Sequence, residues 1–184
     1  MRLLFGIAFV AALPLALSEG LMANHQSRVE GARTPDIHFT PTRQNIADAM
    51  LRLADITEND VVYDLGSGDG RIPIIAAQKY GAKGVGIEID PRLVEISWRI
   101  ANEAEVANRV SFIVGDLFEA DLSQATIVTM YLSPSIMKIL EPKLRALKPG
   151  TRIVSHQFAM PRWAPDKKIQ VDESEILLWT VPKN

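Results

Sequence analysis

An acid and three closely spaced glycines form the segment of this sequence with the clearest chemical meaning. The segment is Val61-Val62-Tyr63-Asp64-Leu65-Gly66-Ser67-Gly68-Asp69-Gly70-Arg71-Ile72, in which an apolar run leads into Asp64 and then into the glycines. Glycines let the backbone approach a ligand that a side chain would keep away. Because the turn carries acids and no lysine, it favours a ligand with hydroxyls and positive charge over one held by its phosphates.

The spacing of these glycines differs from that of the dinucleotide-binding turn, G-x-G-x-x-G. Gly66 and Gly68 fit that pattern, but Arg71 stands where the third glycine should be. Asp64 ends a strand that should be buried, and an unpaired buried charge is costly. We therefore expect the turn to bind a ligand, with a tight structural turn as the alternative.

A second acid, Glu88, lies near the end of the expected strand at 84–89. A carboxylate offers two oxygens in one plane, so Glu88 can accept hydrogen bonds from both hydroxyls of a ribose. The alternative is a solvated strand end.

A third acid, Asp116, follows Gly115 after the apolar segment 110–114. Asp116 could accept a hydrogen bond from the exocyclic amine of a purine, while Ile89 and Leu117 offer apolar faces to the ring. A simple Gly-Asp turn is the alternative.

Tyr131 ends another apolar segment and would stand over the reacting end of a ligand held by the glycine turn. It is our candidate for positioning the reacting groups, and an ordinary core aromatic is the alternative. His156 is expected to be a hydrogen-bonded structural residue and not a base. Trp163 could form the wall of a channel or serve only in packing.

Strands and helices that alternate along the chain must position these residues. Short apolar runs predict strands, and apolar residues at helical spacing predict helices. We expect strands at 61–65, 84–89, 110–114, 126–131, 152–156, 168–171 and 176–181. We expect helices at 42–53 with Thr42 as N-cap, at 71–80 before Gly81, from Asp90-Pro91, and from Ser133-Pro134 with a bend or restart at Pro142. This alternation predicts an α/β fold with a mainly parallel sheet and helices on both faces.

Composition limits the chemistry. The chain has 184 residues, of which 47% are hydrophobic, and this fits one domain with a substantial core. The absence of cysteine excludes disulfides, thiolate catalysis and thiolate zinc sites, and three widely separated histidines make a metal site unexpected. The formal net charge of −2 gives no indication of nucleic-acid binding.

The N-terminus differs from the rest of the chain. Arg2 precedes an apolar run over residues 3–17, which resembles a secretory signal peptide within residues 1–18 or, alternatively, an uncleaved membrane anchor. Residues 19–36 are polar and without periodicity, so they are expected to be a linker. The folded domain is expected to span 37–184.

The glycine turn, Glu88 and Gly115-Asp116 occur in the order and spacing of three motifs of class I S-adenosylmethionine methyltransferases, and the chain from about Pro41 resembles that family. The resemblance implies a Rossmann-like seven-stranded sheet, mostly parallel with an antiparallel C-terminal hairpin. It implies S-adenosylmethionine as cofactor, with Thr42 and Asp69 near its methionine end. The implied cofactor-binding residues are Thr42, Asp64, Gly66, Ser67, Gly68, Asp69, Gly70, Glu88, Ile89, Gly115, Asp116 and Leu117.

Four further segments resemble a narrower group, the small archaeal-type protein-lysine methyltransferases and their membrane-anchored mitochondrial relatives. They are residues 39–42, residues 62–64 with 68–72, residues 125–132 and residues 147–156. This resemblance implies an enzyme that N-methylates lysine side chains of proteins. We expect the chain to be a monomer that does not act on nucleic acid. Tyr131-Leu132-Ser133-Pro134 replaces the Asn-Pro-Pro-Tyr motif of amide and adenine methyltransferases.

Two alternatives stay open on the sequence alone: a small-molecule acceptor, or a non-catalytic module that binds S-adenosylmethionine. For a lysine acceptor, the amine must lose its proton, whose free pKa is about 10.4, and we see no required general base. S-adenosylmethionine is made in the cytosol, which favours a domain anchored through residues 3–17 and facing the cytosol over an exported one.

Overall fold

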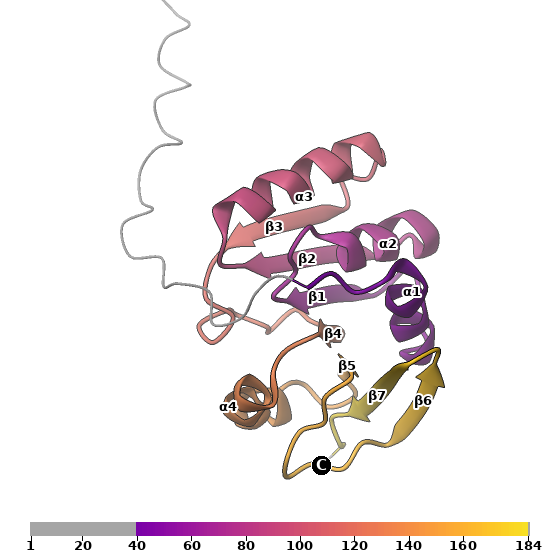
Figure 1. Ribbon diagram of the computed structural model, residues 1–184, viewed down its shortest axis with the longest axis vertical. Helices are drawn as coiled ribbons and strands as arrows, with labels where there is room; N and C mark the ends of the chain where they lie inside the picture. The colour runs from indigo at the N-terminus through magenta and orange to yellow at the C-terminus, as the bar shows by residue number, and fades with distance from the viewer. Residues whose placement is uncertain (1–39, 184) are drawn as a thin grey trace, which may run out of the picture. The chain divides into compact units, whose positions relative to one another are not determined.

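The computed structural model describes residues 40–183, and within them helices and strands alternate as expected (Figure 1). The predicted signal peptide or anchor and the linker lie outside the described residues, so the domain boundaries stay predictions. The elements are α1 (Gln44–Leu53), β1 (Val61–Leu65), α2 (Arg71–Tyr80), β2 (Lys83–Glu88), α3 (Pro91–Glu103), β3 (Val110–Val114), β4 (Ile127–Met130), α4 (Pro134–Arg145), β5 (Arg152–His156), β6 (Lys167–Val171) and β7 (Ser174–Thr180).

The seven strands form one sheet in the order β3-β2-β1-β4-β5-β7-β6. Strands β1 to β5 pair in parallel, whereas β7 runs antiparallel to both β5 and β6. The predicted mostly parallel sheet with an antiparallel C-terminal hairpin is thereby confirmed. The chain adds β2 and β3 on one side of β1 and then β4 and β5 on its other side, so the strand order reverses between β1 and β4. Ligands of such sheets bind beyond the carboxyl ends of the strands at this reversal.

Helices cover both faces of the sheet. Val62 of β1 and Ile127 of β4 pack with α1 and α2 in one buried cluster. Val128 and Met130 of β4 belong to a second cluster, in which they pack with α4. The two clusters hold the central strands between two layers, so the loops at their carboxyl ends start from fixed positions.

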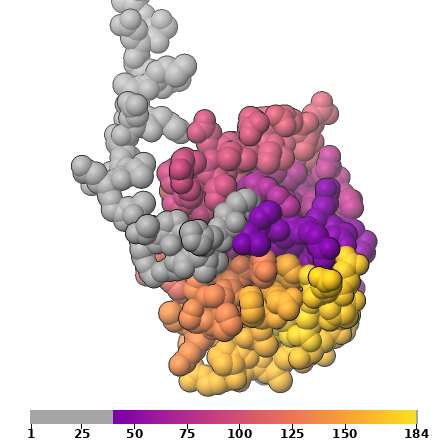
Figure 2. Space-filling model, in the orientation of Figure 1, coloured from indigo at the N-terminus to yellow at the C-terminus, as the bar shows by residue number. Residues whose placement is uncertain are grey.

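The start of α1 lies beside the C-terminal hairpin. In the space-filling view, the indigo surface of α1 adjoins the yellow surface of β6 and β7 (Figure 2). Asn45 of α1 donates a hydrogen bond of 2.8 Å to Asp172, which lies in the turn between the two strands. This contact helps to fix the beginning of α1, directly after Thr42.

Helix ends follow the local sequence signals in two cases. Gly81, with φ of +68°, ends α2 in the left-handed conformation that glycine adopts without strain. Asp90 caps α3 by accepting a hydrogen bond of 2.9 Å from the backbone N–H of Arg92, while Pro91 occupies the first helical position. Asp90 is therefore the N-cap of α3, at the Asp90-Pro91 pair from which the sequence predicts a helix.

The predicted Thr42 cap is wrong, and of the two alternatives predicted at Pro142, a bend or a restart, the restart is wrong. Thr42 does not cap the first helix, which begins at Gln44, because its hydroxyl lies 3.4 Å from Nδ1 of His156 instead. Helix α4 does not restart at Pro142 but continues through it to Arg145. Pro142 is exposed, so the helical carbonyl that loses its backbone partner can bond to water. Among the described residues, no helix is both long and apolar enough to cross a membrane.

Candidate active site

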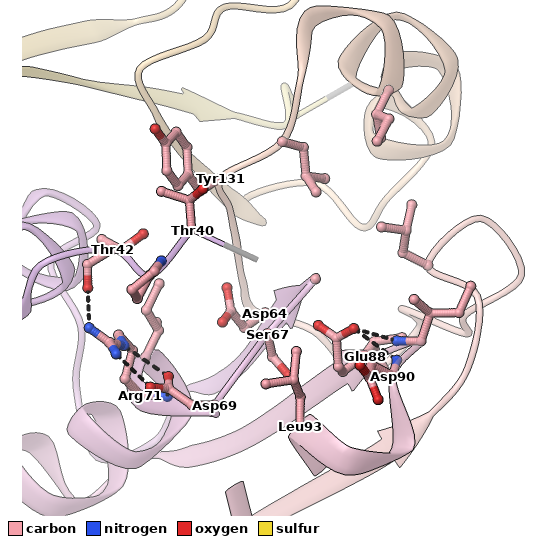
Figure 3. A pocket seen from close by; sticks show the side chains of 18 of the residues that line it. Thr40, Thr42, Asp64, Ser67, Asp69, Arg71, Glu88, Asp90, Leu93 and Tyr131 are labelled. Carbon is pink, nitrogen blue, oxygen red and sulfur yellow. Dashed lines mark hydrogen bonds and ion pairs between the residues drawn. The ribbon is translucent and has the colours of Figure 1, made fainter. Parts of the chain in front are cut away.

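A cavity of about 490 Å³ lies at the carboxyl ends of the central strands (Figure 3). This volume falls in the range of small-molecule sites, roughly 300–1,000 Å³. The cavity brings together eleven of the thirteen residues predicted for the site. They are Thr42, Asp64, Gly66, Ser67, Asp69, Glu88, Ile89, Gly115, Asp116, Leu117 and Tyr131.

The remaining two predicted residues, Gly68 and Gly70, do not line the cavity but shape the turn beside it. Their φ angles are +56° and +75°, and Gly66 has +73°, a region that other residues rarely adopt. A Cβ atom on Gly70 would lie 2.4 Å from Cε1 of Phe112. The turn is thus a tightly packed structure that lets Gly66 and Ser67 face the cavity.

Asp64 is the buried acid of the cavity floor. It is only 4% exposed, and Oδ1 accepts a hydrogen bond of 2.7 Å from Thr129. Burial, together with the nearby carboxylates of Glu88 and Asp69, raises the pKa of Asp64 to about 7, against the effect of the Thr129 bond. No ion pair to Asp64 forms within the described part of the chain, so a positively charged ligand would stabilise its carboxylate.

Glu88 is held in place by backbone donors. Its Oε2 accepts from the N–H of Gly68 at 2.9 Å, and its Oε1 accepts from Ile89 at 2.8 Å and Asp90 at 3.0 Å. A carboxylate has about four lone-pair positions, so about one is left for a ligand. Glu88 can therefore take one ribose hydroxyl without losing a bond, whereas taking both requires a backbone bond to lengthen.

Arg71, noted in the sequence only as a missing glycine, closes one end of the cavity. Its Nε donates to Oδ1 of Asp69 at 2.8 Å, Nη2 donates to the other carboxylate oxygen, and Nη1 donates to the carbonyl of Thr42 at 2.8 Å. The arginine thereby ties the segment before α1 to the glycine turn (Figure 3). The sequence did carry a signal for the pairing of Arg71 with Asp69, because the arginine follows the acid by two residues at the start of a helix.

Asp116 and its neighbours line the cavity beyond β3. Oδ1 of Asp116 accepts a hydrogen bond of 2.9 Å from the N–H of Phe118, which is the local turn geometry that the alternative interpretation predicted. Asp116 and Leu117 nevertheless both line the cavity, together with Phe118, which the sequence did not single out.

Three aromatic rings gather beyond the glycine turn. The Tyr131 ring lies 4.0 Å from that of His156 and 6.2 Å from that of Phe158, between centroids. Tyr131 and Phe158 line the cavity, and Phe158 was missed because it lies in an irregular loop after β5. Burial and the positive charge of Arg43 lower the pKa of His156, so this ring is neutral near pH 7.

Trp163 takes the packing role, one of the two alternatives. Its ring lies 6.4 Å from that of Trp179, the side chain of Arg145 covers it at 4.9 Å, and it does not line the cavity. No cluster of His, Asp or Glu residues in the described range 40–183 could hold a metal ion.

Comparison with known proteins finds methyltransferases. The family model of the ANTKMT methyltransferase domain matches residues 64–167. A protein-lysine N-methyltransferase of Saccharolobus islandicus is 40% identical over 144 residues, covering 77% of this chain and 89% of that protein. An adenine nucleotide translocase lysine N-methyltransferase of Mus musculus is 39% identical over 106 residues, which cover 56% of this chain but only 46% of that protein.

A solved structure shares both fold and sequence with this chain. It is a protein from Salinibacter ruber described as an RNA methyltransferase, in complex with S-adenosyl-L-homocysteine. It is 54% identical, superimposes with a TM-score of 0.77, and the match covers 79% of this chain and 95% of that one.

Proposed function

This chain belongs to the ANTKMT methyltransferase domain family and is an S-adenosylmethionine-dependent methyltransferase, and we propose that it methylates lysine side chains of proteins. The observation that carries the proposal is the similarity to the archaeal protein-lysine N-methyltransferase, which extends over 89% of that protein. The match therefore includes nearly all of the relative.

The residues of the cavity fit S-adenosylmethionine. Within residues 40–183, Asp64 is a buried carboxylate without a cation, and Ser67 Oγ is a buried hydroxyl without a hydrogen-bond partner. A ligand with a positive charge and polar groups would satisfy both. We propose that Glu88 binds the ribose, that Ile89, Asp116 and Leu117 lie around the adenine, and that Gly68 and Gly70 act by shaping the turn. The other donor contacts are proposed for Thr42, Asp64, Gly66, Ser67, Asp69 and Gly115.

When bound, S-adenosylmethionine supplies a methyl group on a positively charged sulfur, ready for in-line displacement. The chain's own part is to position the acceptor and exclude water. Tyr131 and Phe158 present apolar ring faces at the acceptor end, where burial disfavours the charged form of an amine. This environment supports a lysine that reacts as the neutral amine.

RNA methylation is the second candidate, because the 54% identical protein from Salinibacter ruber is described as an RNA methyltransferase. The net charge of −2 and the Tyr131-Leu132-Ser133-Pro134 sequence favour the protein acceptor. RNA binding depends strongly on lysine and arginine that neutralise phosphates.

The experiment that separates the candidates supplies the full chain with methyl-labelled donor and a cell extract of its source. Parallel samples are treated with protease, with ribonuclease, or passed through a filter that retains macromolecules. We expect the label to be lost with protease only, and mass spectrometry of the protein hydrolysate to find Nε-methyl-lysine. Loss with ribonuclease would establish RNA as the acceptor, and label in the filtrate would establish a small molecule.

Two variants complete this experiment. Asp64→Asn removes the buried charge with little change in shape and should abolish labelling. Glu58→Gln removes an exposed carboxylate before β1, at the opposite edge of the sheet, and should label like the wild type. Equal labelling by both variants would contradict the proposed donor site.

We also propose that the chain is a monomer anchored to a membrane through residues 3–17, with the domain facing the cytosol. The apolar run in the sequence and the cytosolic origin of the donor support this. Fractionation with protease protection tests it: the domain should sediment with membranes and be digested without detergent. Recovery of a mature chain starting after Ser18 would show a cleaved signal peptide instead, and light scattering measures the oligomeric state.

A further inference from the structure

Acids dominate the charged lining of the cavity. Five carboxylates line it, from Asp64, Asp69, Glu88, Asp90 and Asp116, and the cations lining it within residues 40–183 are Arg71 and Arg92. S-adenosylmethionine carries a carboxylate beside its ammonium group. A carboxylate in a cavity lined by acids requires a cation, because like charges at short range repel.

The two cations, Arg71 and Arg92, lie at different ends of the cavity. In Figure 3, Arg71 and Asp69 lie at one end of the cavity, Glu88 and Asp90 at the other, and Asp64 with Ser67 between them. If Glu88 binds the ribose, the amino-acid part of the donor extends toward Arg71. Arg92 pairs with Asp90 at the ribose end, and its side chain is 86% exposed.

The guanidinium of Arg71 is already immobilised. It makes three hydrogen bonds, two to Asp69 and one to the Thr42 carbonyl, and arginine has five N–H donors. Two donors therefore remain, one on each terminal nitrogen. Its side chain is 32% exposed, so it is partly shielded from water. A side chain held in this way loses little conformational entropy when a ligand binds.

We propose that Arg71 binds the α-carboxylate of S-adenosylmethionine and makes the site select donors that carry this carboxylate. Asp69 then has a second role beside its proposed donor contact, since it holds the guanidinium of Arg71 in place. Arg71 is thus a specificity residue at the position where dinucleotide-binding turns have glycine. The inference rests on the methyl donor alone and holds whatever the acceptor is.

The test is a calorimetric titration of the full chain with two ligands, S-adenosylmethionine and its decarboxylated form, which differ by the carboxylate. Arg71→Met should weaken binding of S-adenosylmethionine by about 10- to 100-fold, the range for hydrogen bonds to charged groups. The same variant should bind the decarboxylated ligand as well as the wild type or better, because a cation has been removed from a cavity lined by acids.

Arg92→Met is the matched control, and it should leave the ratio of the two affinities unchanged. If Arg71→Met weakened the binding of both ligands equally, Arg71 would only hold Asp69 and Thr42, and the proposal would be wrong. Arg71→Lys and the wild type keep the test decisive if Arg71→Met does not fold. Lysine should retain part of the preference for the carboxylate, and a wild type that bound both ligands equally would overturn the proposal.

Discussion

Thr129 donates a hydrogen bond of 2.7 Å from Oγ1 to Oδ1 of Asp64, across the register of β4 and β1 that places the two residues side by side. Among the residues that the structure describes, the buried acid at the end of β1 therefore has a neutral hydroxyl as its partner and no cation. Its charge is stabilised only in part, and burial raises its pKa to about 7. The protonation of Asp64 should consequently respond to whatever occupies the cavity.

Donor affinity should depend on pH through Asp64. A positively charged donor favours the carboxylate, so binding lowers the pKa of Asp64 from about 7. Below pH 7 the donor must displace a proton, and its affinity should fall by up to about tenfold per pH unit, whereas above pH 7 it should be constant. Titration calorimetry between pH 5.5 and 8.5, in buffers of different ionisation enthalpy, measures both affinity and proton release. Asp64→Asn should show neither effect, and a wild type with constant affinity across this range would refute the prediction.

Asp64 should make the stability of the ligand-free protein fall as pH rises. An ordinary ion-paired acid has the opposite effect on the pH dependence of stability. An unfolded aspartate has a pKa of about 3.9, so between about pH 4 and 7 the folded protein holds a proton that the unfolded chain releases. The free energy of unfolding therefore falls as pH rises through this window. Asp64→Asn should be more stable than the wild type at pH 8, by up to about 4 kcal/mol, and the difference should shrink toward pH 5. Urea denaturation at the two pH values measures this, with Glu58→Gln as control.

The strands and the acids that follow them could be predicted because their signals are local. The apolar residues of segment 61–65 and the three glycines after it determine both the strand and the turn. Glu88 was recognisable because an acid directly after an apolar run has few structural explanations. The parallel pairing of the strands followed from the alternation of strands and helices.

The contacts that the sequence did not reveal join distant segments. Arg71 bonds to the carbonyl of Thr42, 29 residues away, and only the packed fold shows that the two approach. Thr42 was interpreted as a helix cap because threonine before a helix usually is one, but His156, 114 residues away, takes its hydroxyl. Phe158 lies in a loop without periodicity, so nothing in its neighbours indicated that it faces the cavity.

Two glycine substitutions should separate packing from backbone strain. Gly70 and Gly150 both have positive φ, +75° and +86°, but a Cβ on Gly70 would meet Phe112 at 2.4 Å, whereas a Cβ on Gly150 would meet nothing within 4 Å. Gly150→Ala should lower the free energy of unfolding by roughly 1–2 kcal/mol through backbone strain. Gly70→Ala should have the same strain and lower it by roughly 1–3 kcal/mol more through overpacking. Thermal denaturation measures both, and equal losses would show that the turn beside Phe112 can relax.

Glu88→Gln should weaken donor binding more than Asp90→Asn does. The amide of glutamine keeps one acceptor oxygen, whereas the Glu88 carboxylate serves three backbone N–H groups with two oxygens. Losing one acceptor disturbs the glycine turn through Gly68 and removes the position left for a ribose hydroxyl. We expect about a 10- to 100-fold loss of affinity for S-adenosylhomocysteine, measured by calorimetry. A smaller loss than in Asp90→Asn would place the ribose elsewhere.

Substitution of Tyr131 should affect the acceptor and spare the donor. The ring stacks with Phe158 and lies 4.0 Å from His156, so packing against these two rings holds its position. Tyr131→Phe keeps the ring and should retain kcat/KM for a lysine acceptor within about threefold, since aromatic packing is preserved. Tyr131→Leu removes the ring and should lower kcat/KM by about 100-fold, the typical cost of a misplaced reacting group. Calorimetry with S-adenosylhomocysteine should give the same Kd for the wild type and both variants. If Tyr131→Leu weakened donor binding as much as it lowered kcat/KM, Tyr131 would belong to the donor site and not to the acceptor end.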